Sequence, residues 1–260
     1  QIHPENPQVR LIRSGADIIR AGGVIVYPTD SAYALGCHIG DKSALDRIRR
    51  IRRLDARHNF TLVCRDLSEI ATYARVDNRI YRMLKSSTPG PYTFILRATS
   101  EVPRRLMHAK RKTVGLRVPD NAIALALLED LDEPLMSVTL IMPGDEYPLI
   151  DPYDIRETLE HEVDLVIDGG YCGMEPTTVV DLVDETPLVM RAGKGDIASA
   201  IKKAVSADVV ASGGAGELNH FYDAVEAGAT ILLAASVFHF GIIGISQLKE
   251  YLRDKGVNIL

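Results

Sequence analysis

The chain has 260 residues, of which 46% are hydrophobic and 25% are charged, so we expect a folded protein, either one large domain or one domain of about 200 residues plus an appendage. The formal net charge of −5 excludes a protein that binds polyanions through bulk charge alone. The three cysteines, Cys37, Cys64 and Cys172, are widely spaced, which argues against a disulfide framework or a zinc site. The polar N-terminal stretch QIHPENPQ does not resemble a signal peptide, and we expect a cytoplasmic protein.

The first part of the chain alternates helical and strand patterns. Residues 9–21 have the apolar spacing of a helix, which Gly22 and Gly23 would end. The apolar run at 24–27 predicts a short buried strand. From Asp41 another helix is expected, with apolar residues every three positions at Leu45, Ile48, Ile51 and Leu54.

Further strands are predicted at 92–98, 113–118, 135–142, 163–167, 177–182 and 187–191, with helices around 121–131 and 152–161. This interleaving of strands and helices indicates an α/β fold with a largely buried sheet. Residues 229–245 are about long enough to span a bilayer. We do not expect them to do so, because they include Ser236 and His239 and their first half is typical of a strand.

Charge is distributed unevenly along the chain. Residues 47–57 contain six arginines, a second basic cluster runs from Arg104 to Lys112, and acidic residues concentrate at 145–164. The arginine run is either a solvated helix face or a wall that faces a polyanion such as ATP or tRNA. Aromatic residues are not interleaved with these arginines, so recognition by base stacking is not expected.

The motif PTDSAYALGC, at 28–37, contains several hydroxyl-bearing side chains after a predicted strand. Taken alone, it is typical of a strand–turn–helix junction, and PGPYTFIL (89–96), GLRVP (115–119) and PTTVVDL (176–182) are equally ambiguous. In this order and spacing, however, the motifs resemble the YrdC superfamily, and most closely its YciO branch. The resemblance extends from residue 1 to about residue 197.

This resemblance implies a twisted, mixed α/β sheet with a basic concave groove. It also implies an L-threonylcarbamoyladenylate synthase reaction, in which threonine, bicarbonate and ATP, with Mg²⁺, give threonylcarbamoyl-AMP and pyrophosphate. That adenylate serves tRNA threonylcarbamoyladenosine modification, and the groove is also associated with binding tRNA or double-stranded RNA. The chemistry requires positioning and charge stabilisation rather than a covalent nucleophile. We recognise no catalytic triad or metal-ligand cluster, and no catalytic residue is assigned.

Transferred to matching positions, the resemblance implies two groups of binding residues. The threonine-binding residues would be Thr29, Tyr33, Arg117, Ser137 and Thr177, and the nucleotide-binding residues would be Arg52, Thr139 and Arg191. Arg117 has an alternative interpretation as a sheet arginine that extends to solvent. The threonines could equally make only local hydrogen bonds.

The sequence departs from the family pattern at two motifs. Active synthases carry K-x-R and S-x-N, where this chain has Arg52-Arg53-Leu54 and Thr139-Leu140-Ile141. A cation and an amide are thereby lost, although His58 and Asn59 could supply other polar contacts. Two hypotheses therefore remain, an enzyme that forms a threonylcarbamoyl-type adenylate and a non-catalytic module that binds nucleotide or RNA.

Residues 198–260 resemble the C-terminal end of HisF, the cyclase subunit of imidazole glycerol phosphate synthase. They match only the last two β–α units of a TIM barrel, and the resemblance implies weak phosphate-binding positions at Gly213, Gly214, Ala235 and Ser236. The glycines could instead form a simple tight turn. Because two strands cannot close a barrel, we interpret the tail as a fused fragment that is prone to self-association.

Overall fold

The structure is a computed structural model that describes residues 1–55, 58–196, 210–212, 215–226 and 229–259. The chain divides into two compact units, Gln1–Gly195 and Asp196–Leu260. No helix in these described ranges has the length and apolar character needed to cross a bilayer.

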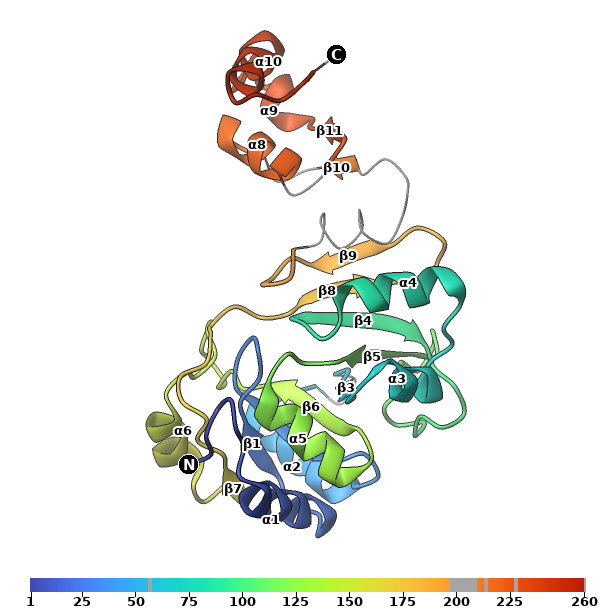
Figure 1. Cartoon of the computed structure of the whole chain (residues 1–260), viewed down its shortest axis with the longest axis vertical. Coiled ribbons are helices and arrows are strands. Elements are labelled where there is room, and N and C mark those ends of the chain that lie inside the picture. Colours follow the sequence, from blue (N-terminus) through green and yellow to red (C-terminus); the bar gives the residue numbers. More distant parts are fainter. Residues whose placement is uncertain (56–57, 197–209, 213–214, 227–228, 260) are drawn as a thin grey trace. The chain divides into compact units, whose positions relative to one another are not determined.

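The first unit is built on a nine-stranded mixed sheet, which confirms the predicted α/β fold (Figure 1). The strands are β1 (Ile25–Tyr27), β2 (Ala34–His38), β3 (Thr61–Val63), β4 (Tyr92–Arg97), β5 (Thr113–Arg117), β6 (Leu135–Thr139), β7 (Leu165–Val166), β8 (Thr178–Asp181) and β9 (Leu188–Arg191). Their order across the sheet is β7-β1-β2-β6-β3-β5-β4-β8-β9. Pairs β1–β7, β3–β5 and β4–β8 are parallel, and the other pairs are antiparallel.

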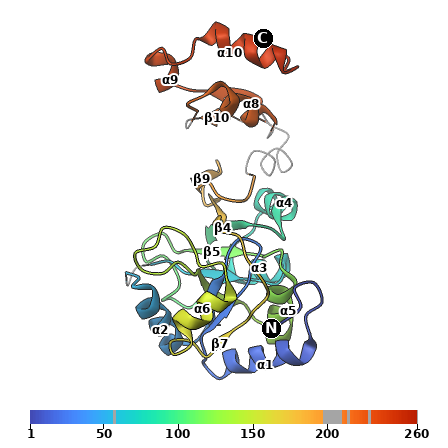
Figure 2. The same ribbon diagram turned by 90° about the vertical axis from the view of Figure 1, so that its left-hand side faces the viewer.

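Six helices are described in this unit. They are α1 (Val9–Arg20), α2 (Lys42–Arg52), α3 (Leu67–Tyr73), α4 (Asn78–Ser87), α5 (Ala122–Leu131) and α6 (Pro152–Leu159). Helices α1 and α5 lie side by side at one end of the sheet, as Figures 1 and 2 show. Their apolar residues join β1 in one core, in which Ile19, Leu127 and Tyr27 are fully buried.

Helix α2 begins and ends where its sequence dictates. The side chain of Asp41 caps its N-terminus by accepting a hydrogen bond from the backbone N–H of Ala44 at 2.9 Å. Leu45, Ile48 and Ile51 are buried, as the apolar spacing predicts. Arg53 takes a left-handed conformation and ends the helix, so Leu54 lies outside it.

The residues after the PTD motif form a strand rather than the helix that a strand–turn–helix junction would require. Ala34–His38 is β2, which pairs antiparallel with β1. The segment from Ala34 to Cys37 is buried on both faces, which favours a central strand over an amphipathic helix. Gly36 allows the ring of Tyr27 to lie against the strand, because a Cβ there would be 2.8 Å from Tyr27 Cε1.

The second unit contains the two β–α units predicted from the sequence. Strands β10 (Val210–Ser212) and β11 (Ile231–Leu233) are parallel, and the helices are α8 (Leu218–Glu226), α9 (Ser236–His239) and α10 (Ile245–Asp254). Phe221, Val237 and Leu248 form part of a small apolar core. On β11, Ile231 and Leu233 remain 46% and 59% exposed, so the apolar surface of this unit is only partly covered.

Candidate functional site

A cavity of about 450 Å³ lies within the first unit, over the middle strands of its sheet. Its floor follows a row of cross-strand neighbours, because Ser137 on β6 is paired with Thr61 on β3, and Thr61 is paired with Gly115 on β5. Gly115 has no side chain, and therefore leaves space above the sheet. The size falls within the range of small-molecule sites.

The turn between β1 and β2 contributes Thr29 and Ser31 to the cavity. The Thr29 hydroxyl donates to the carbonyl of Ala32 at 2.6 Å and accepts from the backbone N–H groups of Ser31 and Ala32 at 3.2 Å. These bonds fix the turn locally, which accords with the local hydrogen-bonding alternative for this threonine. The hydroxyl therefore helps to shape the cavity whether or not a ligand contacts it.

Arg117, at the end of β5, is held by an internal carboxylate. Its Nη2 group pairs with Asp30, and both side chains are 8% exposed. Its Nη1 group donates to the hydroxyl of Ser31 at 3.3 Å, whereas its buried Nε has no hydrogen-bond partner among the described residues. Arg117 is thus buried rather than extended to solvent, contrary to the alternative interpretation.

Ser137 contacts the hydroxyl of Tyr27, a buried residue of β1. Their hydroxyl oxygens are 2.8 Å apart, and Ser137 donates to the carbonyl of Leu35 at 3.1 Å. Burial raises the pKa of Tyr27 to about 12, so this phenol remains protonated near neutral pH. Tyr27 can therefore donate to Ser137 and hold its hydroxyl in one orientation.

A second group of polar side chains joins β4, β8 and β9. The hydroxyl oxygens of Thr93 and Thr177 lie 2.9 Å apart. Arg191 donates from Nε and Nη2 to the carbonyl of Thr177, at 3.1 and 2.9 Å, and from Nη2 to its hydroxyl. These bonds hold the guanidinium of Arg191 at the cavity wall.

The C-terminal end of α2 contributes a cation with an unsatisfied donor. Arg52 lines the cavity, and its buried Nε lacks a hydrogen-bond partner among the described residues. Burial lowers the pKa of Arg52, and burial together with Arg52 and Arg49 lowers the pKa of His58. His58 therefore favours its neutral form at this wall, where it packs edge-on against Phe60.

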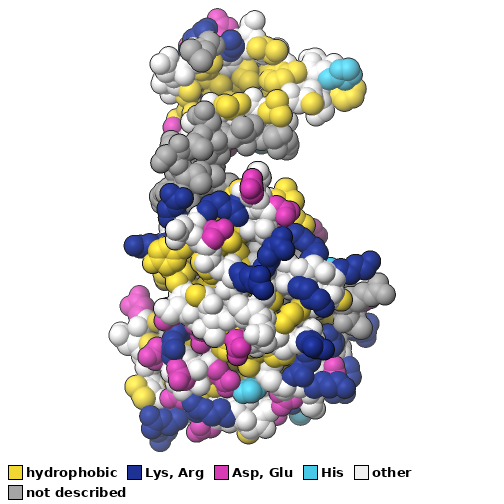
Figure 3. Space-filling view, turned by 90° about the vertical axis from the view of Figure 1, so that its right-hand side faces the viewer, with side chains coloured by type: hydrophobic (Ala, Val, Ile, Leu, Met, Phe, Trp, Pro, Cys, Tyr) yellow, Lys and Arg dark blue, Asp and Glu magenta, His cyan; other side chains and the backbone are white. Residues whose placement is uncertain are grey.

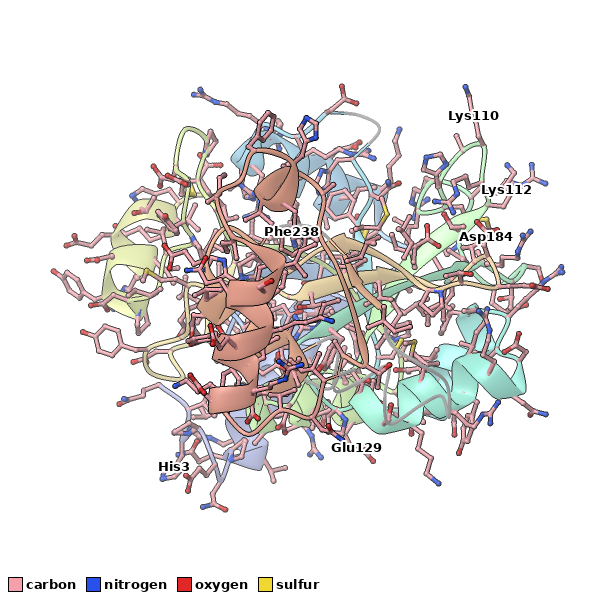
Figure 4. All side chains as sticks on the ribbon, turned by 90° about the horizontal axis from the view of Figure 1, so that it is seen from above. His3, Lys110, Lys112, Glu129, Asp184 and Phe238 are labelled. Carbon is pink, nitrogen blue, oxygen red and sulfur yellow. The ribbon has the colours of Figure 1, made fainter. Side chains whose placement is uncertain are left out.

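The second basic cluster is divided between cavity and solvent. Arg111 lines the cavity and pairs with the buried carboxylate of Asp181 at 2.7 Å. Lys110 and Lys112 point outward from the same loop (Figure 4). The loop thus places one paired arginine in the wall and two exposed lysines outside it.

The arginines differ in how their charges are balanced. In α2, Arg47 pairs with Asp164 at 2.7 Å and Arg49 pairs with Asp46 at 3.2 Å, so part of the arginine run is a paired helix surface. No ion pair with a carboxylate is found for the cavity residues Arg52 and Arg191 within the described ranges, and none of the lining residues is acidic. Figure 3 shows lysine and arginine side chains gathered on one side of the first unit.

The cavity brings together most of the predicted binding residues. Those lining it are Thr29, Arg117, Ser137, Thr177, Arg52, Thr139 and Arg191. Tyr33 is not among them, because its buried hydroxyl donates to the carbonyl of Gly170 at 2.6 Å and accepts from the N–H of Gly169. Ile141 lines the cavity, whereas Leu54 does not.

Sequence reasoning missed several polar residues at the site, notably Asp30, Thr93 and Arg111. Asp30 and Thr93 belong to motifs that the sequence had already singled out, and a lone acid beside a buried strand is a signal for a paired charge. Three or more His, Cys, Asp or Glu residues do not gather into a metal site anywhere in the described part of the chain.

The predicted phosphate positions of the tail are only partly described. Gly213 and Gly214 lie outside the described residues. Ala235 is the N-cap of the four-residue helix α9, and Ser236 is its first residue. The tail site therefore stays a prediction.

Comparison with known proteins identifies the family. The Sua5/YciO/YrdC model, described as telomere recombination, matches residues 17–193. The chain belongs to this family. A second model, described as histidine biosynthesis protein, matches residues 194–244, in agreement with the HisF-like tail predicted from the sequence.

Relatives within the Sua5/YciO/YrdC family match the first unit closely. YciO of Escherichia coli K12 is 61% identical over 196 residues, which are 75% of this chain and 95% of the relative. A protein of Haemophilus influenzae is 63% identical over 198 residues, or 76% of this chain and 96% of the relative. The crystal structure of E. coli YciO has a TM-score of 0.73 and covers 78% of this chain and 97% of that chain.

A more distant member is the threonylcarbamoyl-AMP synthase of Pyrococcus abyssi. It is 29% identical over 185 residues, which are 70% of this chain and 54% of the synthase. The crystal structure of P. abyssi Sua5 complexed with L-threonine has a TM-score of 0.71, covers 99% of this chain and 89% of that chain, and is 20% identical. At that identity the structural likeness shows the fold alone.

Proposed function

We propose that the cavity of the first unit binds a nucleotide and a threonine-like amino acid, and that the protein is an enzyme of the L-threonylcarbamoyladenylate synthase type. One observation carries this proposal, the convergence in a single cavity of Arg117, Arg52 and Arg191 with several threonine hydroxyls. The names of its distant relatives, a threonylcarbamoyl-AMP synthase and a protein complexed with L-threonine, supply the substrate class.

Two parts of the cavity suit two kinds of ligand. Arg117 and Ser137 would hold the amino acid, because a buried guanidinium and a fixed hydroxyl match a small carboxylate and its neighbouring polar groups. Arg52 and Arg191, which lack carboxylate partners among the described residues, would face the phosphates with Thr139 beside them. Arginines bind phosphate oxygens through paired, directed hydrogen bonds.

The proposed reaction has two steps. The amino group of threonine attacks bicarbonate, an N–C bond forms and water leaves, which gives a carbamate. A carbamate oxygen then attacks the α-phosphorus of ATP, and the bond to pyrophosphate breaks. In such a transfer the protein contributes mainly position and charge stabilisation. Arg52 and Arg191 would therefore hold the phosphates in line with the carbamate.

Mg²⁺ would accompany ATP in this reaction, and when bound it would neutralise charge on the departing pyrophosphate. The described residues that line the cavity include no carboxylate, the side chain through which Mg²⁺ is usually bound. The ion would therefore be held by the phosphates of the nucleotide, with water, as is usual for nucleotide-bound Mg²⁺.

The alternative is a non-catalytic module that holds a nucleotide or RNA. It is favoured by Ile141, an apolar side chain at the cavity where active synthases of the family pattern have an amide. The exposed Lys110 and Lys112 beside the cavity could contact RNA phosphates without reading sequence. In this alternative the cavity binds its ligand but catalyses no reaction.

The decisive experiment is to incubate the protein with ATP, L-threonine and bicarbonate and to measure pyrophosphate and the adenylate product. The synthase proposal expects both products in equal amounts, and their loss when threonine is omitted. Arg191→Ala should abolish them, whereas Arg50→Ala, on the exposed face of α2, should not. Nucleotide binding without either product would instead support the non-catalytic module.

A further inference from the structure

Asp30 forms a buried ion pair with Arg117. Its carboxylate and the guanidinium of Arg117 are almost completely buried, at 8% exposure each, although neither charge belongs to an apolar core. Removing two charges from water costs free energy, so such a pair needs good geometry and further hydrogen bonds. Asp30 has them, because its Oδ2 accepts from the N–H of Asp120 at 3.1 Å and its backbone carbonyl accepts from Lys194.

Asp30 therefore fixes Arg117 from one side. Nη2 of Arg117 is used by Asp30, and Nη1 reaches Ser31 at 3.3 Å. Each Nη nitrogen carries a second N–H, for which no bond is found among the described residues, and Nε is buried without a partner there. A buried N–H without an acceptor is rare in proteins. Because Arg117 lines the cavity, a ligand there can accept from the remaining N–H groups of its guanidinium.

We propose that Asp30 is a positioning residue, which orients Arg117 so that the remaining N–H groups of its guanidinium are presented to the carboxylate of the amino acid ligand. This inference rests on the proposed function, because it concerns the same cavity. The proposal also implies that the amino acid part and the nucleotide part of the cavity differ in net charge. The Asp30–Arg117 pair is neutral, so the amino acid is recognised by a directed hydrogen bond rather than by net charge.

The test is Asp30→Asn, measured by calorimetric titration with L-threonine and, separately, with AMP. Asparagine keeps the size, but only its Oδ1 can accept, so it cannot accept from both the Nη2 of Arg117 and the backbone N–H of Asp120. We expect the Kd for L-threonine to rise about tenfold, as for loss of one charge-assisted hydrogen bond. The Kd for AMP should stay within twofold. L-Threoninol, which lacks the carboxylate, should bind native and variant protein equally.

A double-mutant cycle separates positioning from a general structural effect. Arg117→Lys removes the guanidinium that Asp30 orients, so in that background Asp30→Asn should change threonine affinity by less than twofold. Asp30→Glu keeps the charge and takes the place of Asp30→Asn in this test if that variant does not fold. Its Kd for L-threonine should lie between the native value and a tenfold higher one. Unchanged or tighter threonine binding by Asp30→Asn, or an additive tenfold loss on top of Arg117→Lys, would overturn the proposal.

A measurement without ligand distinguishes failure of this inference from failure of the proposed function. In native protein the Nε–H resonance of Arg117, assigned through its loss in Arg117→Lys, should be protected from exchange with solvent, and Asp30→Asn should abolish that protection. If native protein binds no threonine, threonine is rejected as the ligand, while loss of the protected resonance still supports the positioning role. Persistence of the protected resonance in Asp30→Asn would overturn that role.

Discussion

Replacing Arg52 by Met should stabilise the empty protein and weaken nucleotide binding at the same time. In the structure the Nε of Arg52 is buried without a hydrogen-bond partner among the described residues, and burial lowers its pKa. A buried unsatisfied polar group costs about 1–3 kcal/mol. Because Arg52 is only partly buried, we take the lower end, about 1 kcal/mol. For a unit of this size, that corresponds to a Tm higher by roughly 2–4 °C.

The same substitution removes a donor to phosphate. A hydrogen bond to a charged group contributes about 1.5–3 kcal/mol, so the Kd for ATP should rise about ten- to a hundredfold. At ATP concentrations a hundred times the native Kd, native protein gains about 2.7 kcal/mol, whereas the variant gains about 1.4 kcal/mol or less. The order of Tm values should therefore reverse between empty and ATP-saturated protein.

Thermal melts with and without ATP, together with calorimetric titration at low salt, measure both effects. The native Kd itself should rise with added salt, because exposed parts of the arginine–phosphate contacts are screened. Arg50→Met is the matched control, since Arg50 lies on the exposed face of the same helix, and it should change neither Tm nor Kd appreciably. A lower Tm for empty Arg52→Met, or a Kd within twofold of native, would refute the reasoning.

Three further predictions concern activity, the tail and packing. Leu54→Arg combined with Ile141→Asn should raise adenylate synthesis with ATP, threonine and bicarbonate; a variant that folds and binds ATP yet gains no activity would show that these positions do not limit it. Truncation to 1–197 should leave nucleotide affinity and the Tm of the first unit unchanged and reduce light scattering from self-association, whereas a large fall in Tm would show that the tail is part of the fold. Gly36→Ala should lower the Tm, at a cost of about 1–3 kcal/mol, because the new methyl would lie 2.8 Å from the buried Tyr27 ring; a Tm equal to native would contradict this packing.

The sequence alone determined most of the regular elements of the first unit. Helix α2 illustrates why, since Asp41 supplies a cap and Ile48 and Ile51 fall on one face, all within a span of eleven residues. Such local signals can be read without knowing the rest of the molecule. The ordered motifs also identified the family and the α/β fold before any tertiary information.

The short elements were harder to predict, because tertiary contacts stabilise them. Strand β2 follows a turn and resembles a strand–turn–helix junction in isolation, yet it pairs with β1 on one side and β6 on the other. Strand β3 has three residues and pairs with β5 and β6, which are distant in sequence. Strand formation depends on such partners more than on local propensity.

The candidate site was decided only by the tertiary structure. The motifs indicated Arg117 and Thr29, but not that Asp30 would pair with Arg117 across 87 residues. Nor did they show that Tyr33 would bind the backbone at Gly170 instead of lining the cavity. Residue types and spacing along the chain report which side chains are available. The pairing of strands far apart in sequence sets which of them share a cavity and which charges are already neutralised, because that depends on distance in space and on burial.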